Sequence, residues 1–126
     1  MAYQQSEAVK ITLVANADLS LAQGKFVKLL ASGKCDLVTA TTDRVIGVLD
    51  NKPKLGQEAA IVVLGTTKMV ASATLALGDS LATAVDGRAA TALTTAGLSN
   101  LGTVLIANTV ANGWVTVLVN CVNQTR

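Results

Sequence analysis

The chain has no histidine and little of what catalytic sites are usually built from. Its 126 residues include only two cysteines, one proline and one each of tryptophan, tyrosine and phenylalanine. Without histidine, neither a Ser-His-Asp nor a Cys-His arrangement is possible, and two thiols alone make a poor zinc site. We therefore expect no catalytic, cofactor-binding or metal-binding residues, and a protein that is not an enzyme.

Charge is also scarce. The ten basic and eight acidic residues give a net charge of +2, too balanced for a protein that binds the phosphate backbone of a nucleic acid. No charged side chain occurs between residues 89 and 125. A strand on the surface usually carries lysine or glutamate, so we expect this third of the chain to be largely buried, in the core or in an interface.

Long hydrophobic runs are absent. The longest strictly apolar run, residues 59–64, is far shorter than the ~20 residues of a membrane-spanning helix. The first residues carry no basic region of the kind that begins a signal peptide. We expect no membrane partner, synthesis and use without export, and free, buried thiols at Cys35 and Cys121.

Glycine, valine and threonine are plentiful, and their spacing predicts strands and turns. Most of the ten glycines are separated by the length of one short strand and its turn. Candidate strands cover residues 8–14, 25–31, 35–40, 45–49, 58–64, 68–73, 80–85, 88–93, 102–108 and 114–122. Candidate turns are Asn112-Gly113, Asp86-Gly87, Ser32-Gly33 and Gly65-Thr66. The pattern predicts an all-β fold: a small barrel or sandwich of short antiparallel strands with little helix.

The same order of residue types occurs twice in the chain, at about residues 19–64 and 75–119. Each copy begins with a Leu-x-Leu motif and contains an apolar run, a glycine turn followed by a basic residue, and a second apolar run. Self-similarity of this kind is typical of a duplicated scaffold. Chance similarity within a chain rich in Gly, Ala, Val and Thr is the alternative.

We expect one β domain, residues 9–126, preceded by a flexible arm, residues 1–8. The arm is polar and contains Tyr3, one of the few aromatic residues, so we predict that it becomes ordered against a partner. An ordinary frayed terminus is the alternative.

The last predicted strand alternates between two faces. Val115, Val117 and Val119 share one face, which we predict to be the core side. Trp114 and Leu118 share the other. An exposed tryptophan beside a leucine is typical of a contact anchor, so Tyr3, Trp114 and Leu118 are the candidate partner contacts. Alternatively, Trp114 only covers its own hairpin.

Seven short motifs, taken in order, resemble those of the capsid cement, or head decoration, proteins of tailed bacteriophages. They are Gly24-Lys-Phe-Val-Lys-Leu29, Asp43-Arg-Val-Ile-Gly-Val-Leu49, Gly56-Gln-Glu-Ala-Ala-Ile-Val-Val63, Gly78-Asp-Ser-Leu81, Asp86-Gly-Arg88, Gly102-Thr-Val-Leu105 and Asn112-Gly-Trp-Val-Thr-Val-Leu118. The match covers about residues 18–119. Trp114 departs from the resemblance, because a polar residue is more usual there.

The resemblance implies an all-β protein on the outside of a phage head, with the major capsid protein as its partner. It also implies a homo-oligomer, often a trimer, that braces the shell. A tail or surface component of structural or adhesive character is one alternative, and a small β-barrel enzyme or ligand binder is another. The missing histidine and scarce aromatics argue against the last.

Overall fold

The computed structural model describes residues 8–91, 101–107 and 110–121. Their strands are β1 (Val9–Val14), β2 (Phe26–Leu29), β3 (Cys35–Leu37), β4 (Val45–Leu49), β5 (Glu58–Val70), β6 (Ser80–Thr83), β7 (Ala89–Thr91), β8 (Gly102–Ile106) and β9 (Trp114–Asn120). No described residue is helical. The predicted all-β fold with little helix is confirmed.

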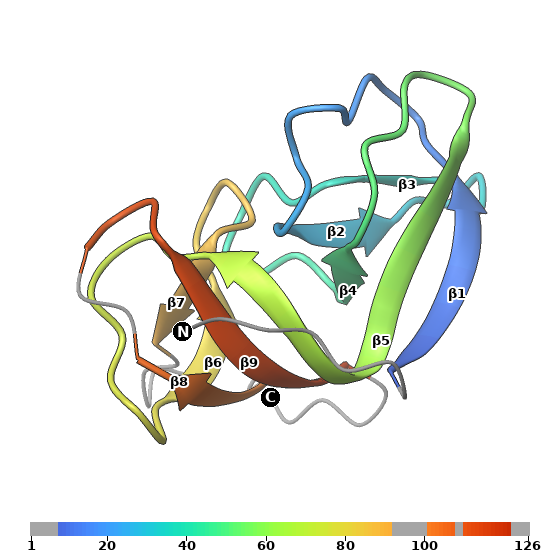
Figure 1. Ribbon diagram of the computed structural model, residues 1–126. Coiled ribbons are helices and arrows are strands. Elements are labelled where there is room, and N and C mark those ends of the chain that lie inside the picture. The colour runs from blue at the N-terminus through green and yellow to red at the C-terminus, as the bar shows by residue number, and fades with distance from the viewer. Residues whose placement is uncertain (1–7, 92–100, 108–109, 122–126) are drawn as a thin grey trace.

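All nine strands belong to one curled sheet, in which every ladder is antiparallel (Figure 1). The order is β3-β2-β4-β5-β9-β8-β6-β7, and β1 also pairs with β5. The sheet curls into a half-barrel. Of the two predicted forms, a barrel and a sandwich, the barrel is therefore closer to the observed fold. The described part of the chain contains no helix long and apolar enough to cross a bilayer.

Strand β5 joins the two halves of the sheet. Its first half pairs with β1 and β4, and its second half pairs with β9 (Figure 1). The predicted turn at Gly65-Thr66 is therefore wrong, and the strands expected at residues 58–64 and 68–73 are one strand. Gly65 has a φ of 116°, and a Cβ there would lie 2.8 Å from the Cα of Ala8. Glycine lets β5 bend and pass close to the start of β1 without reversing direction.

The strands form two units with the same pairing scheme. The first unit comprises β1 to β4 and the first half of β5, and the second comprises the remainder. In the first, β2 pairs with β3 and β4, and in the second, β6 pairs with β7 and β8. The β2–β3 and β6–β7 hairpins also close with the same hydrogen bond. The Leu30 N–H donates to the carbonyl of Lys34, and the Ala84 N–H donates to that of Arg88. Duplication at the level of the sequence stays a prediction.

The core is divided into two clusters of buried side chains. One lies within the first unit and includes Leu19, Val27 and Ile61. The other lies in the second unit but also receives side chains from the first: Phe26, Val38, Val45 and Val48. The first unit thus contributes its only phenylalanine to its neighbour, which fixes the two units together.

The two Leu-x-Leu motifs behave alike. Leu19 and Leu75 are buried, whereas Leu21 and Leu77 are 92% and 72% exposed. One leucine of each motif therefore anchors the loop to the core, and the other projects into solvent.

Candidate functional site

The outer face of β5 and β9 carries two of the three predicted contact residues. Trp114 and Leu118 are 49% and 43% exposed, and Leu64 on the neighbouring strand is 41% exposed. The register places Val70 opposite Trp114 and Thr66 opposite Leu118, so these side chains share one face. Tyr3 lies outside the described residues.

The predicted core face of β9 is correct, because Val115, Val117 and Val119 are fully buried. Thr116 is also buried, although it lies on the same face of β9 as Trp114 and Leu118. Its backbone pairs with Lys68 on one side and Ile106 on the other, and the strands on both sides shield it. Burial across the uncharged stretch is uneven rather than general, since Val110 is 61% exposed.

Trp114 packs against a glycine of the first unit. A Cβ at Gly24 would lie only 2.5 Å from the indole ring, and Val70 is the next neighbour. The ring borders a shallow cleft of about 240 Å³ that is also lined by Gln23, Asp50 and Lys68. Because Gly24 has no side chain, the indole ring of Trp114 packs directly against its backbone. About half of the Trp114 side chain remains exposed to solvent.

The polar groups beside this cleft are engaged with one another. The Asp50 carboxylate accepts from Lys10 Nζ at 2.8 Å, and its backbone carbonyl accepts from Gln23 Nε2 at 2.9 Å. These contacts hold the rim of the cleft in place and leave the indole as its main apolar surface.

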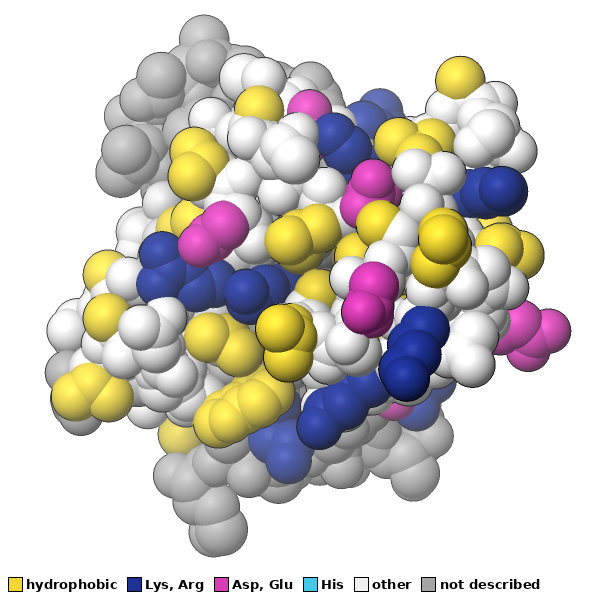
Figure 2. All heavy atoms as spheres, turned by 90° about the horizontal axis from the view of Figure 1, so that it is seen from above, with side chains coloured by type: hydrophobic (Ala, Val, Ile, Leu, Met, Phe, Trp, Pro, Cys, Tyr) yellow, Lys and Arg dark blue, Asp and Glu magenta, His cyan; other side chains and the backbone are white. Residues whose placement is uncertain are grey.

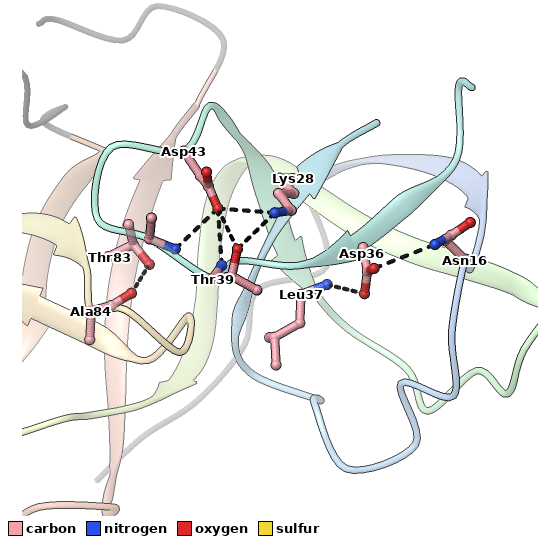
Figure 3. A network of polar contacts seen from close by, with 9 residues as sticks. Asn16, Lys28, Asp36, Leu37, Thr39, Asp43, Thr83 and Ala84 are labelled. Atoms are coloured by element: carbon pink, nitrogen blue, oxygen red, sulfur yellow. Dashed lines mark hydrogen bonds and ion pairs between the residues drawn. The ribbon is translucent and has the colours of Figure 1, made fainter. Parts of the chain in front are cut away.

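Asp43 organises the turn before β4 (Figure 3). One of its carboxylate oxygens accepts from the Thr39 N–H at 3.0 Å, the Ala40 N–H at 3.1 Å and Lys28 Nζ at 3.2 Å. The bond from the Thr39 backbone, with those from Lys28 and Ala40, lowers the pKa of Asp43. The geometry is that of a stabilised turn, in which one carboxylate oxygen gathers the surrounding donors.

The two cysteines are free and buried, as expected. Burial raises the pKa of both thiols, that of Cys121 to about 12. A thiol rather than a thiolate is present at neutral pH, so neither residue is poised as a nucleophile. Among the described residues, no three acidic or cysteine side chains gather as a metal site would require.

A second concavity lies mainly in the first unit, and no sequence pattern pointed to it. This apolar groove of about 480 Å³ is lined by Ile11 of β1, Leu29 of β2, Val45 and Ile46 of β4 and Val63 of β5, together with Cys121, which follows β9, and Arg44, its charged member. Its walls come from four strands, which explains why neither spacing nor periodicity along the chain revealed it.

Viewed from above, the surface mixes hydrophobic side chains with basic and acidic ones (Figure 2). Apolar exposure is therefore distributed over several places, among them the loop residues Leu21, Leu55 and Leu77. The sequence analysis did not select these leucines, although the paired Leu-x-Leu motifs marked where two of them lie.

No family model and no curated protein matches the chain. Two solved structures share its fold. The N base of the head fiber gp8.5 of bacteriophage phi29 aligns with a TM-score of 0.67 at 15% identity, over 90% of this chain and 94% of that one. A chain from the capsid of Myoviridae phage XM1 aligns with a TM-score of 0.66 at 17% identity, over 95% and 88%. The resemblance to phage head decoration proteins is confirmed at the level of the fold.

Proposed function

We propose that this chain is a structural protein of a phage virion that binds the outer surface of the capsid and stabilises the shell. The observation that carries the proposal is a fold shared with two phage head proteins over nearly the whole chain. The exposed indole and leucines described above supply apolar surface for a partner. The partner is the major capsid protein, and no catalytic step is assigned.

The mechanism is thermodynamic linkage. A protein that binds the assembled shell but not its separated subunits shifts the equilibrium toward the shell, by an amount set by its affinity and concentration. Opening the shell then requires that the contacts with the bound protein also break.

Self-association into a homotrimer on the shell is part of the proposal, and rests on the resemblance to decoration proteins. We further propose that the protein is made in the host cytoplasm and acts on the surface of the virion.

The test compares heads with and without the protein during heating, while a dye reports release of the genome. Heads saturated with the protein should release their genome at a higher temperature. Equal release temperatures at full occupancy would contradict a stabilising role, and a tail-like or adhesive role would then be favoured.

The contact role of Trp114 is tested by Trp114→Ala. Loss of a true hot spot weakens binding by about 2 kcal/mol per site, or roughly 30-fold. Val85→Ala is the matched control, because Val85 is 62% exposed and lies in the β6–β7 hairpin rather than on β9. Equal affinities of the two variants would show that the indole only covers the protein's own surface.

A further inference from the structure

In the first unit, one edge of strand β1 pairs with no other strand among the described residues. Strand β1 pairs with β5 on one side, and there the Ala15 N–H donates to Gln57. On the opposite edge, the Asn16 N–H donates to Cys35. Because backbone groups of successive residues point to opposite edges of a strand, the N–H of Val14 points to the same open edge as that of Asn16.

The second unit contains the corresponding edge. The bond from Asn16 recurs as a bond from Ser72 to the carbonyl of Ala89. Val70, two residues before Ser72, therefore corresponds to Val14, two residues before Asn16. The second unit therefore shows which kind of segment binds to such an edge.

In the second unit the edge is occupied by residues 24–26, which come from the first unit. The Val70 N–H donates to the Gly24 carbonyl at 2.9 Å, and the Phe26 N–H donates to the Gly87 carbonyl at 2.7 Å. The segment thus lies between the strand edge and the hairpin at residues 84–88, bonded to both. Its Phe26 side chain is fully buried in the second-unit core.

In the first unit, no described residue fills the matching slot. Gly33 occupies the place in its hairpin that Gly87 occupies in the other, since each donates to the residue three positions earlier. A Cβ at Gly87 would lie 2.7 Å from the carbonyl oxygen of Phe26, whereas a Cβ at Gly33 would meet no described atom within 4 Å. The apolar groove, lined by Ile11 of β1 and Leu29 of β2, adjoins this slot.

We propose that an extended segment of the shell subunit inserts between β1 and the hairpin at residues 30–34. It would accept a bond from the Val14 N–H, donate one to the Gly33 carbonyl and place a large apolar side chain in the groove. This mode of recognition is β-strand addition. The inference rests on the proposed function, and adds a strand-addition site for the shell to the apolar contact surface around Trp114.

Charge defines the segment further. Arg44 lines the groove, and the exposed Lys34 lies in the hairpin turn beside it. A segment with an acidic residue next to its apolar anchor complements both cations.

A second copy of this chain is a poor source for the segment. Gly78 donates to Val104 as Gly24 donates to Leu49, so the equivalent of Phe26 in the second unit is Ser80. That position offers no large apolar side chain, and Phe26 itself is already buried within each copy.

The first test removes the donor at the open edge with Val14→Pro. Proline suits an edge strand whose N–H is unpaired, so the melting temperature should change little. Binding to heads that lack the protein, measured by cosedimentation, should weaken about tenfold or more, as expected for a lost hydrogen bond and an added steric conflict. Val70→Pro is the matched control: it removes the N–H that donates to Gly24, and should lower the melting temperature by several degrees.

Leu29→Glu and Arg44→Glu test the groove without altering the backbone. Leu29 is 48% exposed, so a charge there is tolerated by the fold but opposes an apolar anchor and an acidic neighbour. Both variants should bind heads more weakly than wild type. If they and Val14→Pro bind as wild type does, the slot is not the docking site, although the proposed function stands.

The source of the segment is tested by a photo-reactive residue at position 29 in protein bound to heads. Cross-links to the shell subunit are expected. Cross-links only to a second copy, or only to other parts of the same chain, would overturn the proposed source. Failure of wild-type protein to bind heads at all would instead contradict the proposed function.

Discussion

Individual residues fix the turns from which this sheet is built, and Asp43 shows how. Its carboxylate accepts from two backbone N–H groups and from Lys28 (Figure 3), so its removal leaves several donors without their partner. We expect Asp43→Ala to lower the free energy of unfolding by about 1–3 kcal/mol. Urea denaturation at neutral pH measures this loss, with the exposed Glu58→Ala as control. An equal, small effect of both substitutions would contradict the role of Asp43.

The same carboxylate makes stability depend on pH. Because the hydrogen bonds hold the pKa of Asp43 below its usual value, its stabilisation is complete above the unfolded pKa, about 4. It is lost as the pH falls through the lower, folded pKa. The stability difference between wild type and Asp43→Ala should therefore shrink on acidification below about pH 4. If the stability difference between wild type and Asp43→Ala stays the same at low pH, it arises from packing and not from the charge of Asp43.

Gly24 is the residue on which the indole rests. We expect Gly24→Ala to destabilise the protein more than Gly56→Ala, because both glycines have a φ of 81° but a Cβ meets the Trp114 ring only at Gly24. The shared backbone strain cancels in the comparison. Thermal melts of both variants, repeated with Trp114→Ala, form a double-mutant cycle. If Trp114→Ala leaves the gap between them unchanged, the indole is not the cause.

At the scale of elements, β1 and the second half of β5 are matched strands with different edges. The Val70 N–H has a partner in Gly24, whereas the corresponding Val14 N–H faces the open edge. We expect the Val70 amide to exchange hydrogen at least about 100-fold more slowly than the Val14 amide in the free protein. Residue-resolved exchange by NMR measures both rates. Equal protection would mean that another segment of the chain already covers β1.

At the scale of the whole molecule, the prediction of an oligomer rests on the uncharged stretch from residue 89 to 125 and on the exposed apolar side chains of the sheet and loops. We expect an oligomer, and a trimer on the shell. Light scattering over a range of concentrations measures its mass. A monomer at high concentration, together with isolated single copies on the shell, would contradict this prediction.

The sequence by itself determined the local features of this protein. Glycine spacing placed the strands, alternation identified the valine face of β9, and the expectation of free, buried thiols at Cys35 and Cys121 is confirmed. These features depend on residues close together in the chain, where backbone preference and side-chain period decide the outcome. The contact roles of Trp114, Leu118 and Tyr3 stay predictions.

Only the tertiary structure decided how the strands combine. The pattern around Gly65 suits a turn, yet β5 continues through it because β1 and β9 pair along its two halves. Likewise, nothing near Phe26 in the chain indicates that it fills the core of the other unit, or that no described residue fills the equivalent slot. Such features depend on hydrogen bonds and packing between residues far apart in the chain, and these form only when the whole sheet is assembled.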